Sequence, residues 1–279
     1  MFFKLCFEQN GKVFDPQVRN KIVCKDIKRQ APVYEVSYED FEGTNGSRES
    51  NASFRPFEIV LTFDIFYANL FDKELTVTEL YELIFTGYQY HISYSLSPGK
   101  RFKVNPTNFE LTEEANDYST IEITFNIPSG SAESLASTLS DFSLAEEWQF
   151  SQGLVAEDYK YTHQTSHFII YNAGSFEIDP REHYLRIAVE GESEGNVTIF
   201  NKTTGDRFVY YPSLSTNLGQ TLVLDGVIPK LNGVSCGINT NHGLINLVEG
   251  VNEIEIQNIT RVKSSWDFRF LYKLSLIHI

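Results

Sequence analysis

The stretch FEIVLTFDI at residues 57–65 decides the fold class of the first half of the chain. Apolar residues occupy every second position, and Glu58, Thr62 and Asp64 lie between them. Because successive side chains of a β-strand point to opposite faces, this period of two predicts a strand with one buried and one hydrated face. The stretch IEITFNI at residues 121–127 repeats the pattern. Together the two stretches predict a mainly β fold.

An amphipathic helix is predicted between these two strands. Thr76 and Glu79 have the spacing of an N-terminal capping box, and apolar side chains follow at helical spacing as far as Phe85. The apolar stripe of this helix has to pack against a sheet. A second helix is predicted after Pro128, where alanine and leucine side chains between 132 and 139 would share one face.

The second half is predicted to be an all-β sandwich. Short apolar stretches are separated by turn residues at the spacing that such folds show. The predicted strands are 185–189, 197–200, 208–211, 221–224 and 253–259.

The two halves are predicted to be separate domains, 1–165 and 166–273. Residues 146–167 mix charged, glycine and aromatic residues without a clear period, which is typical of a connection between domains. The apolar residues 274–279 follow a strand-like stretch with no turn signal, and we expect them to be a non-native tail.

Composition excludes several classes of protein. A hydrophobic content of 42% over 279 residues is enough to bury a full core. No apolar run approaches the roughly 18 residues of a membrane span. The apolar start of the chain is too short for a secretory signal, so we expect synthesis in the cytoplasm and no membrane contact. A net charge of −14 argues against wrapping of nucleic acid, which requires Lys and Arg side chains. The acidity lies in residues 1–165, where 14 Lys and Arg stand against 25 Asp and Glu.

The cysteine and histidine residues do not form a recognisable metal or disulfide pattern. Cys6, Cys24 and Cys236 lack the spacing of a zinc cluster or a disulfide framework, and we predict buried thiols. His163 and His167 have the spacing of a helical zinc pair, but their aromatic and aliphatic neighbours favour a strand. On one strand the two residues would lie about 13 Å apart, too far for one metal ion.

Signatures of catalysis are also missing from the sequence. Acidic pairs such as Glu113-Glu114, Glu146-Glu147 and Glu157-Asp158 are interpreted as surface charge. The chain has no G-x-S-x-G, phosphate-loop or H-E-x-x-H motif. The basic residues between Lys21 and Arg29 are interpreted as a strand face, and Trp266 as a core residue. We therefore predict no catalytic, cofactor-binding or metal-binding residue, and we expect that the chain is not an enzyme.

The order of several motifs resembles the distal tail proteins of siphophages that infect Gram-positive bacteria. In the first half the matches are an acidic, glycine-containing loop at 39–53, RPF at 55–57 with the strand that follows, the predicted helix, and SPGKRFKV at 97–104. In the second half they are FIIYNAG at 168–174 with Asp179-Pro180, IFNKTTG at 199–205, LVLDG at 222–226 and GVNEI at 250–254. Each motif is weak alone, but a fixed order over most of the chain is specific.

The resemblance implies an N-terminal ring-forming β-sandwich or split-barrel domain with one packed helix, and a C-terminal galectin-like β-sandwich. Six copies would form a hub ring, single or doubled back to back, that joins the tail tube protein to the tail-associated or tail-tip protein. DNA would pass through the lumen without specific binding, because an acidic wall repels the phosphate backbone. Receptor-binding or baseplate proteins are further implied partners. The protein of such a phage or prophage would assemble in the bacterial host cytoplasm and reside in the virion tail.

Two other functions are left open by the residues. A carbohydrate-binding adhesin module would use the aromatic side chains of the second half, although the His, Asn, Arg, Trp and Glu cluster of a galectin-type sugar site cannot be placed on 166–273. A cell-wall hydrolase of a tail tip is the other. Neither accounts as well for the strand-helix-strand order of the first half.

Overall fold

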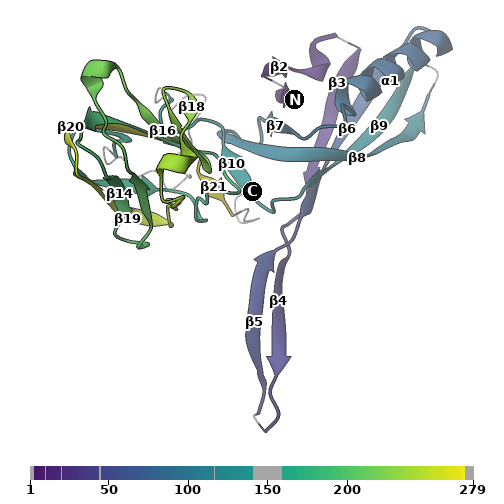
Figure 1. Cartoon of the computed structure of the whole chain (residues 1–279). Helices are drawn as coiled ribbons and strands as arrows, with labels where there is room; N and C mark the ends of the chain where they lie inside the picture. Colours follow the sequence, from purple (N-terminus) through teal and green to yellow (C-terminus); the bar gives the residue numbers. More distant parts are fainter. Residues whose placement is uncertain are drawn as a thin grey trace. The chain divides into compact units, whose positions relative to one another are not determined.

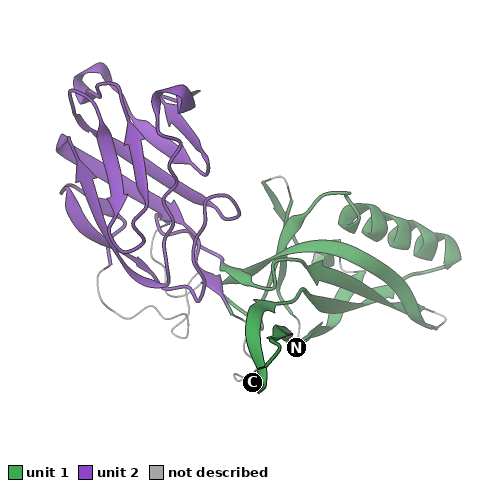
Figure 2. Cartoon of the chain, turned by 60° about the horizontal axis from the view of Figure 1, so that its bottom comes forward, with its two compact units in different colours: residues 1–133, 273–279 green, residues 134–272 purple. Residues whose placement is uncertain are grey.

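The computed structural model describes residues 3–9, 11–19, 21–43, 45–115, 117–140 and 159–273. The chain divides into two compact units, residues 1–133 with 273–279, and residues 134–272 (Figure 2). This division lies N-terminal to the join expected between 165 and 166. Much of the expected connection, Trp148 and the expected tail 274–279 lie outside the described residues.

The first unit is built on one antiparallel sheet. Its path runs β2-β1-β7-β8-β9-β6-β3, and β10 pairs with β8. The bounds are β1 (Leu5–Gln9), β2 (Lys12–Phe14), β3 (Ile22–Arg29), β6 (Phe57–Phe66), β7 (Tyr90–Tyr94), β8 (Lys100–Glu114), β9 (Tyr118–Ile127) and β10 (Ala132–Ser134). A short 3₁₀ helix, η1 (Pro16–Arg19), precedes β3.

The two strands predicted from period-two alternation form the centre of this sheet. β6 and β9 are hydrogen-bonded neighbours, with Phe63 opposite Ile121 and Leu61 opposite Ile123. Their alternate apolar side chains are buried in one core. Burial of each such side chain stabilises the fold by roughly 1.5–3 kcal/mol, which explains why the alternation predicts the strands so well.

Helix α1 (Leu70–Ile84) is the one α-helix among the described residues, and it begins before its predicted start. The Oδ1 atom of Asn69 accepts a hydrogen bond from the Asp72 amide at 3.0 Å, and Asp72 Oδ2 accepts one from the Ala68 amide at 3.0 Å. This reciprocal cap starts the helix, so the prediction of a cap at Thr76 was wrong. Thr76, Leu80 and Ile84 are buried on the side that packs on the sheet.

The second predicted helix, between 132 and 139, was also wrong. The segment contains β10 and turns instead. Ser129 Oγ donates to the carbonyl of Ser131 at 3.1 Å, and Ser134 Oγ donates to the carbonyl of Ala136 at 2.6 Å. Such local side-chain bonds compete with the helical backbone pattern.

The second unit consists of two antiparallel sheets, which agrees with the predicted β-sandwich. One runs β11-β20-β13-β16-β17-β18 and the other β12-β19-β14-β15. The bounds are β11 (Thr162–His163), β12 (His167–Asn172), β13 (Leu185–Glu192), β14 (Val197–Asn201), β15 (Arg207–Tyr210), β16 (Leu222–Asp225), β17 (Ile228–Leu231), β18 (Val234–Ser235), β19 (Gly250–Gln257), β20 (Thr260–Phe268) and β21 (Leu271–Tyr272), with 3₁₀ helices η2 (Thr216–Leu218) and η3 (Gly237–Asn239). All five predicted strands are present. Their inward side chains form one core around Trp266.

Candidate functional site

The described residues hold no group of three His, Cys, Asp or Glu side chains that could bind a metal ion. His163 and His167 lie on strands of different sheets, β11 and β12. The His163 ring stacks on Phe168 with centroids 4.0 Å apart, whereas His167 Nε2 lies 3.3 Å from the carboxylate of Glu255. The two imidazoles are therefore engaged separately.

The thiols and the candidate tryptophan have structural surroundings. Cys24 and Cys236 are buried as predicted, whereas Cys6 is half-buried. Burial raises the pKa of the Cys24 thiol to about 12, so it stays protonated and unreactive at neutral pH. Trp266 is fully buried and its Nε1 donates to Ser264 Oγ at 3.3 Å, which confirms the predicted core role.

The predicted charged groups are paired with neighbours. Lys21 contacts Asp72 at 2.5 Å, and Lys25 and Lys28 lie within 3.7 Å of carboxylates of their own sheet. Glu114 forms an ion pair with Lys73 of α1. Glu146, Glu147, Glu157 and Asp158 lie outside the described residues. These pairings are those of a hydrated strand face, as predicted for the basic residues.

An exposed two-stranded ribbon is the most distinctive feature of the first unit. β4 (Tyr34–Asp40) and β5 (Ser47–Phe54) pair only with each other in the described part of the chain, between β3 and β6 (Figure 1). We call this ribbon the arm. Tyr38 and Phe41 of the arm are 65% and 48% exposed. An isolated ribbon of two strands is only marginally stable in water, so exposed aromatic rings on it point to a surface that becomes covered on assembly.

The arm corrects the sequence reading of 39–53 as a loop. Two signals for a hairpin are present in the sequence, the alternation of Tyr34, Val36 and Tyr38 and the turn-forming pair Asn45-Gly46. They were outweighed by the polar second strand, which has water on both faces and therefore no apolar period.

A groove runs along the outward side of α1. Its volume is about 470 Å³, and its walls come from the helix and from the segment between β2 and β3. Nothing in the sequence marks it, because its two walls are more than fifty residues apart in the chain.

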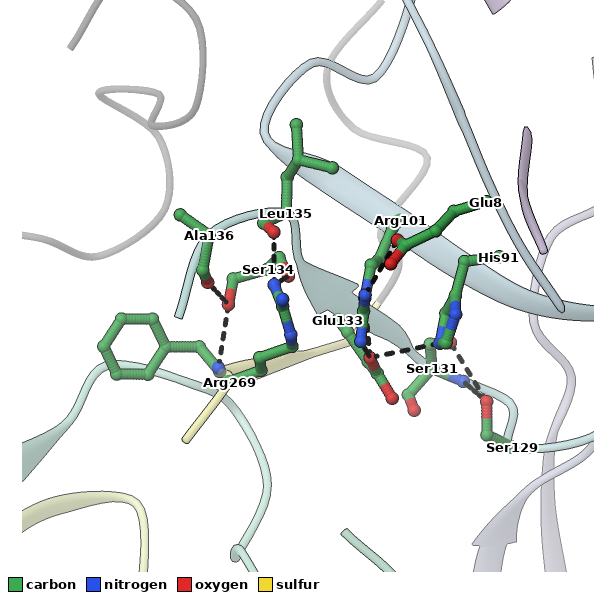
Figure 3. A network of polar contacts seen from close by, with 11 residues as sticks. Glu8, His91, Arg101, Ser129, Ser131, Glu133, Ser134, Leu135, Ala136 and Arg269 are labelled. Atoms are coloured by element: carbon green, nitrogen blue, oxygen red, sulfur yellow. Dashed lines mark hydrogen bonds and ion pairs between the residues drawn. The ribbon is translucent and has the colours of Figure 1, made fainter. Parts of the chain in front are cut away.

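A buried ionic network holds the end of the first unit. The Nε and Nη2 atoms of Arg101 lie 2.9 Å from the Glu133 carboxylate, His91 Nε2 lies 3.6 Å from it, and Arg101 Nη1 donates to Glu8 at 3.1 Å (Figure 3). Burial alone would raise the pKa of Glu133. The hydrogen bond from His91 and the guanidinium of Arg101 outweigh it and lower this pKa to about 2.

The next residues are held within the second unit by a different arginine. Arg269 Nη1 donates to the carbonyl of Ser134 at 3.0 Å and also to that of Leu135 (Figure 3). The Ser134 amide donates to the carbonyl of Phe270 at 2.8 Å. Glu133 and Ser134 are thus each anchored in their own unit, so this network is structural.

The outer face of the four-stranded sheet gathers further polar groups. Lys202 Nζ lies 2.9 Å from Glu253 and 3.6 Å from Glu255, and the Arg207 guanidinium covers the Phe200 ring at 3.7 Å. These side chains satisfy one another. They do not reproduce the sugar-binding cluster that the sequence also failed to show.

Comparison with known proteins gives the fold a place. Residues 10–127 match the family model for the phage tail protein RIFT-related domain. The crystal structure of the Dit protein of phage SPP1, described as a paradigm of the hub adsorption apparatus in phages infecting Gram-positive bacteria, superposes with a TM-score of 0.67. That match has 10% identity and covers 97% of this chain and 100% of the SPP1 chain. The fold is that of a siphophage distal tail protein.

Two baseplate structures show the same fold at lower similarity. The phage p2 baseplate in its activated conformation with Sr contains a chain with a TM-score of 0.52 and 12% identity, covering 98% of this chain and 99% of that one. The corresponding structure with Ca gives 0.51 and 12%, with coverage of 99% and 100%. No curated protein sequence is significantly similar to this chain. The distal tail protein fold thus spans both units, and the resemblance inferred from the ordered motifs is confirmed. No helix in the described ranges has the length and apolar content needed to cross a membrane.

Proposed function

We propose that this chain is a structural subunit of the hub of a long, non-contractile phage or prophage tail. Six copies form a ring that joins the tail tube to the tail tip and lets DNA pass without specific binding. The observation that carries the proposal is the whole-chain likeness to the SPP1 distal tail protein, which covers 97% of this chain. A chain of this kind works in the virion tail after assembly in the host cytoplasm.

The first unit supplies surfaces suited to self-association. β2 and β3 are the open edges of its main sheet, and an open edge offers unpaired backbone groups to another chain. The arm adds exposed tyrosine and phenylalanine side chains, which are enriched at protein interfaces. We therefore assign ring contacts to the first unit.

The charge of the first 165 residues fits a conduit for DNA. In this stretch 25 Asp and Glu outnumber 14 Lys and Arg, so a ring of six copies carries a strong excess of negative charge. Carboxylates facing the lumen repel phosphate groups and keep the genome from binding. Neutralising such carboxylates is expected to slow DNA ejection.

The second unit, for which we propose a galectin-like sandwich, serves as a docking surface for receptor-binding or baseplate proteins. The polar groups on the outer face of its four-stranded sheet already pair with one another, for example His167 with Glu255. This supports protein docking over sugar recognition, because a sugar site needs polar groups that remain available to hydroxyls.

Native mass spectrometry of the full chain tests the proposal. We expect a hexamer, or a dodecamer if two rings associate back to back. A chain that stays monomeric across the micromolar range, and that a tail tube or tail-tip protein does not assemble, would contradict it.

A further inference from the structure

The groove along α1 has an apolar floor. Phe14, Ile22, Leu75, Leu80 and Leu83 contribute to its lining, and its volume of about 470 Å³ lies within the range of roughly 300–1,000 Å³ typical of ligand sites. A groove of this size can bury a few side chains of a bound segment.

Helix α1 exposes apolar side chains beside this groove. Phe71 and Leu75, four residues apart and therefore on one helical face, are 89% and 59% exposed. Leu83 continues the same face two turns further on and is 38% exposed. An amphipathic helix normally presents polar residues on the side away from its sheet. A contiguous apolar stripe there marks an interaction surface.

The charges around the groove define what it accepts. Asp15, Asp72 and Glu79 line it, against Lys21 as the one cation of the lining. Lys21 is already bound to Asp72 at 2.5 Å. The rim therefore carries an excess of negative charge, which attracts Lys and Arg and repels carboxylates.

The arm of a second copy is a poor occupant on the same grounds. Its strands and turn, residues 34–54, contain five acidic residues against the single Arg48. Like charges placed together at an interface cost several kcal/mol. The occupant is therefore a different chain.

We propose that the groove along α1 binds an apolar peptide segment flanked by Lys or Arg residues from another protein. Apolar side chains of the segment fill the space beside Leu75 and Leu83, and its cations lie against Asp15 and Glu79. This site is separate from the ring contacts assigned to the arm, so the groove and the hub proposal can fail independently.

Selection from a random peptide library on the full chain tests this site. We expect a consensus with apolar anchors flanked by Lys or Arg, and a labelled consensus peptide should bind at least tenfold more weakly to Leu75→Ser/Leu83→Ser. The matched control is Leu218→Ser, a 74% exposed leucine in the second unit, which should leave binding unchanged. Asp15→Asn/Glu79→Gln should weaken the same peptide and make its binding less salt-dependent.

Two results would overturn the proposal. One is a selection with no consensus that depends on Leu75 and Leu83, or with a consensus that lacks cations. The other is a change of oligomeric state in Leu75→Ser/Leu83→Ser by sedimentation velocity, which would make the groove a contact between copies of this chain. Circular dichroism of each variant verifies folding, and the charge variant, which leaves the apolar floor intact, decides the matter if the leucine variant unfolds.

Discussion

Glu133 is a carboxylate that the fold keeps charged. Its partners Arg101 and His91 are 32 and 42 residues away in sequence, so no local pattern could predict this network. The sequence predicted a helical segment here, whereas the ionic contacts and the serine side chains hold the chain extended. Long-range charge pairing is therefore the part of the molecule least accessible to sequence reasoning.

The pKa of Glu133 gives a pH-dependent prediction. Because the folded chain lowers this pKa from 4.5 to about 2, the charge stabilises the fold fully above pH 4.5, and the contribution is lost as the pH falls towards 2. Glu133→Gln should lower the free energy of unfolding at pH 7 by up to about 3 kcal/mol, and the gap to the wild type should close between pH 4.5 and 2.

Urea unfolding at fixed protein concentration measures this difference. Glu74→Gln, at an exposed position of α1, is the control and should change the unfolding midpoint little at any pH. A gap between Glu133→Gln and the wild type that persists unchanged at pH 2.5 would show that packing, and not charge, accounts for the effect.

At the scale of elements, the sequence predicted what has a local apolar period and missed what does not. β6 and β9 were predicted because one face of each is buried. The arm was missed because water reaches both of its faces, and the start of α1 was missed because Thr76 and Glu79 imitate a cap inside the helix. Cap geometry requires knowledge of the backbone, which only the structure supplies.

The N-terminal cap of α1 is open to a direct test. Asn69→Ala removes the bond to the Asp72 amide and should destabilise the first unit by about 1 kcal/mol. Thr78→Ala, at an exposed mid-helix position, should be neutral or slightly stabilising, because alanine favours helix. Hydrogen exchange of the first helical turn reports the difference; equal exchange in Asn69→Ala and wild type would rule out the cap.

The arm should decide oligomeric state. Tyr38→Ser/Phe41→Ser removes two exposed rings that pack on nothing large in their own unit, so we expect folded chains that no longer assemble. Tyr211→Ser/Leu218→Ser makes a comparable change on the second unit and should assemble normally. Analytical ultracentrifugation distinguishes the two, and full assembly of the arm variant would remove the arm from the ring contact.

At the scale of the whole molecule, two β units share one chain, and the fold of both matches a tail hub protein. The division of roles, ring in the first unit and docking in the second, follows from where the exposed aromatic rings and the paired polar surface lie. Negative charge in the first 165 residues adds the conduit. Each of these roles depends on six copies closing into a ring.

Negative-stain electron microscopy of the purified full chain tests that closure most directly. The account predicts particles with six-fold symmetry and a central hole, with the second units around the rim. Compact particles without a hole, or open chains of subunits that never close, would contradict it.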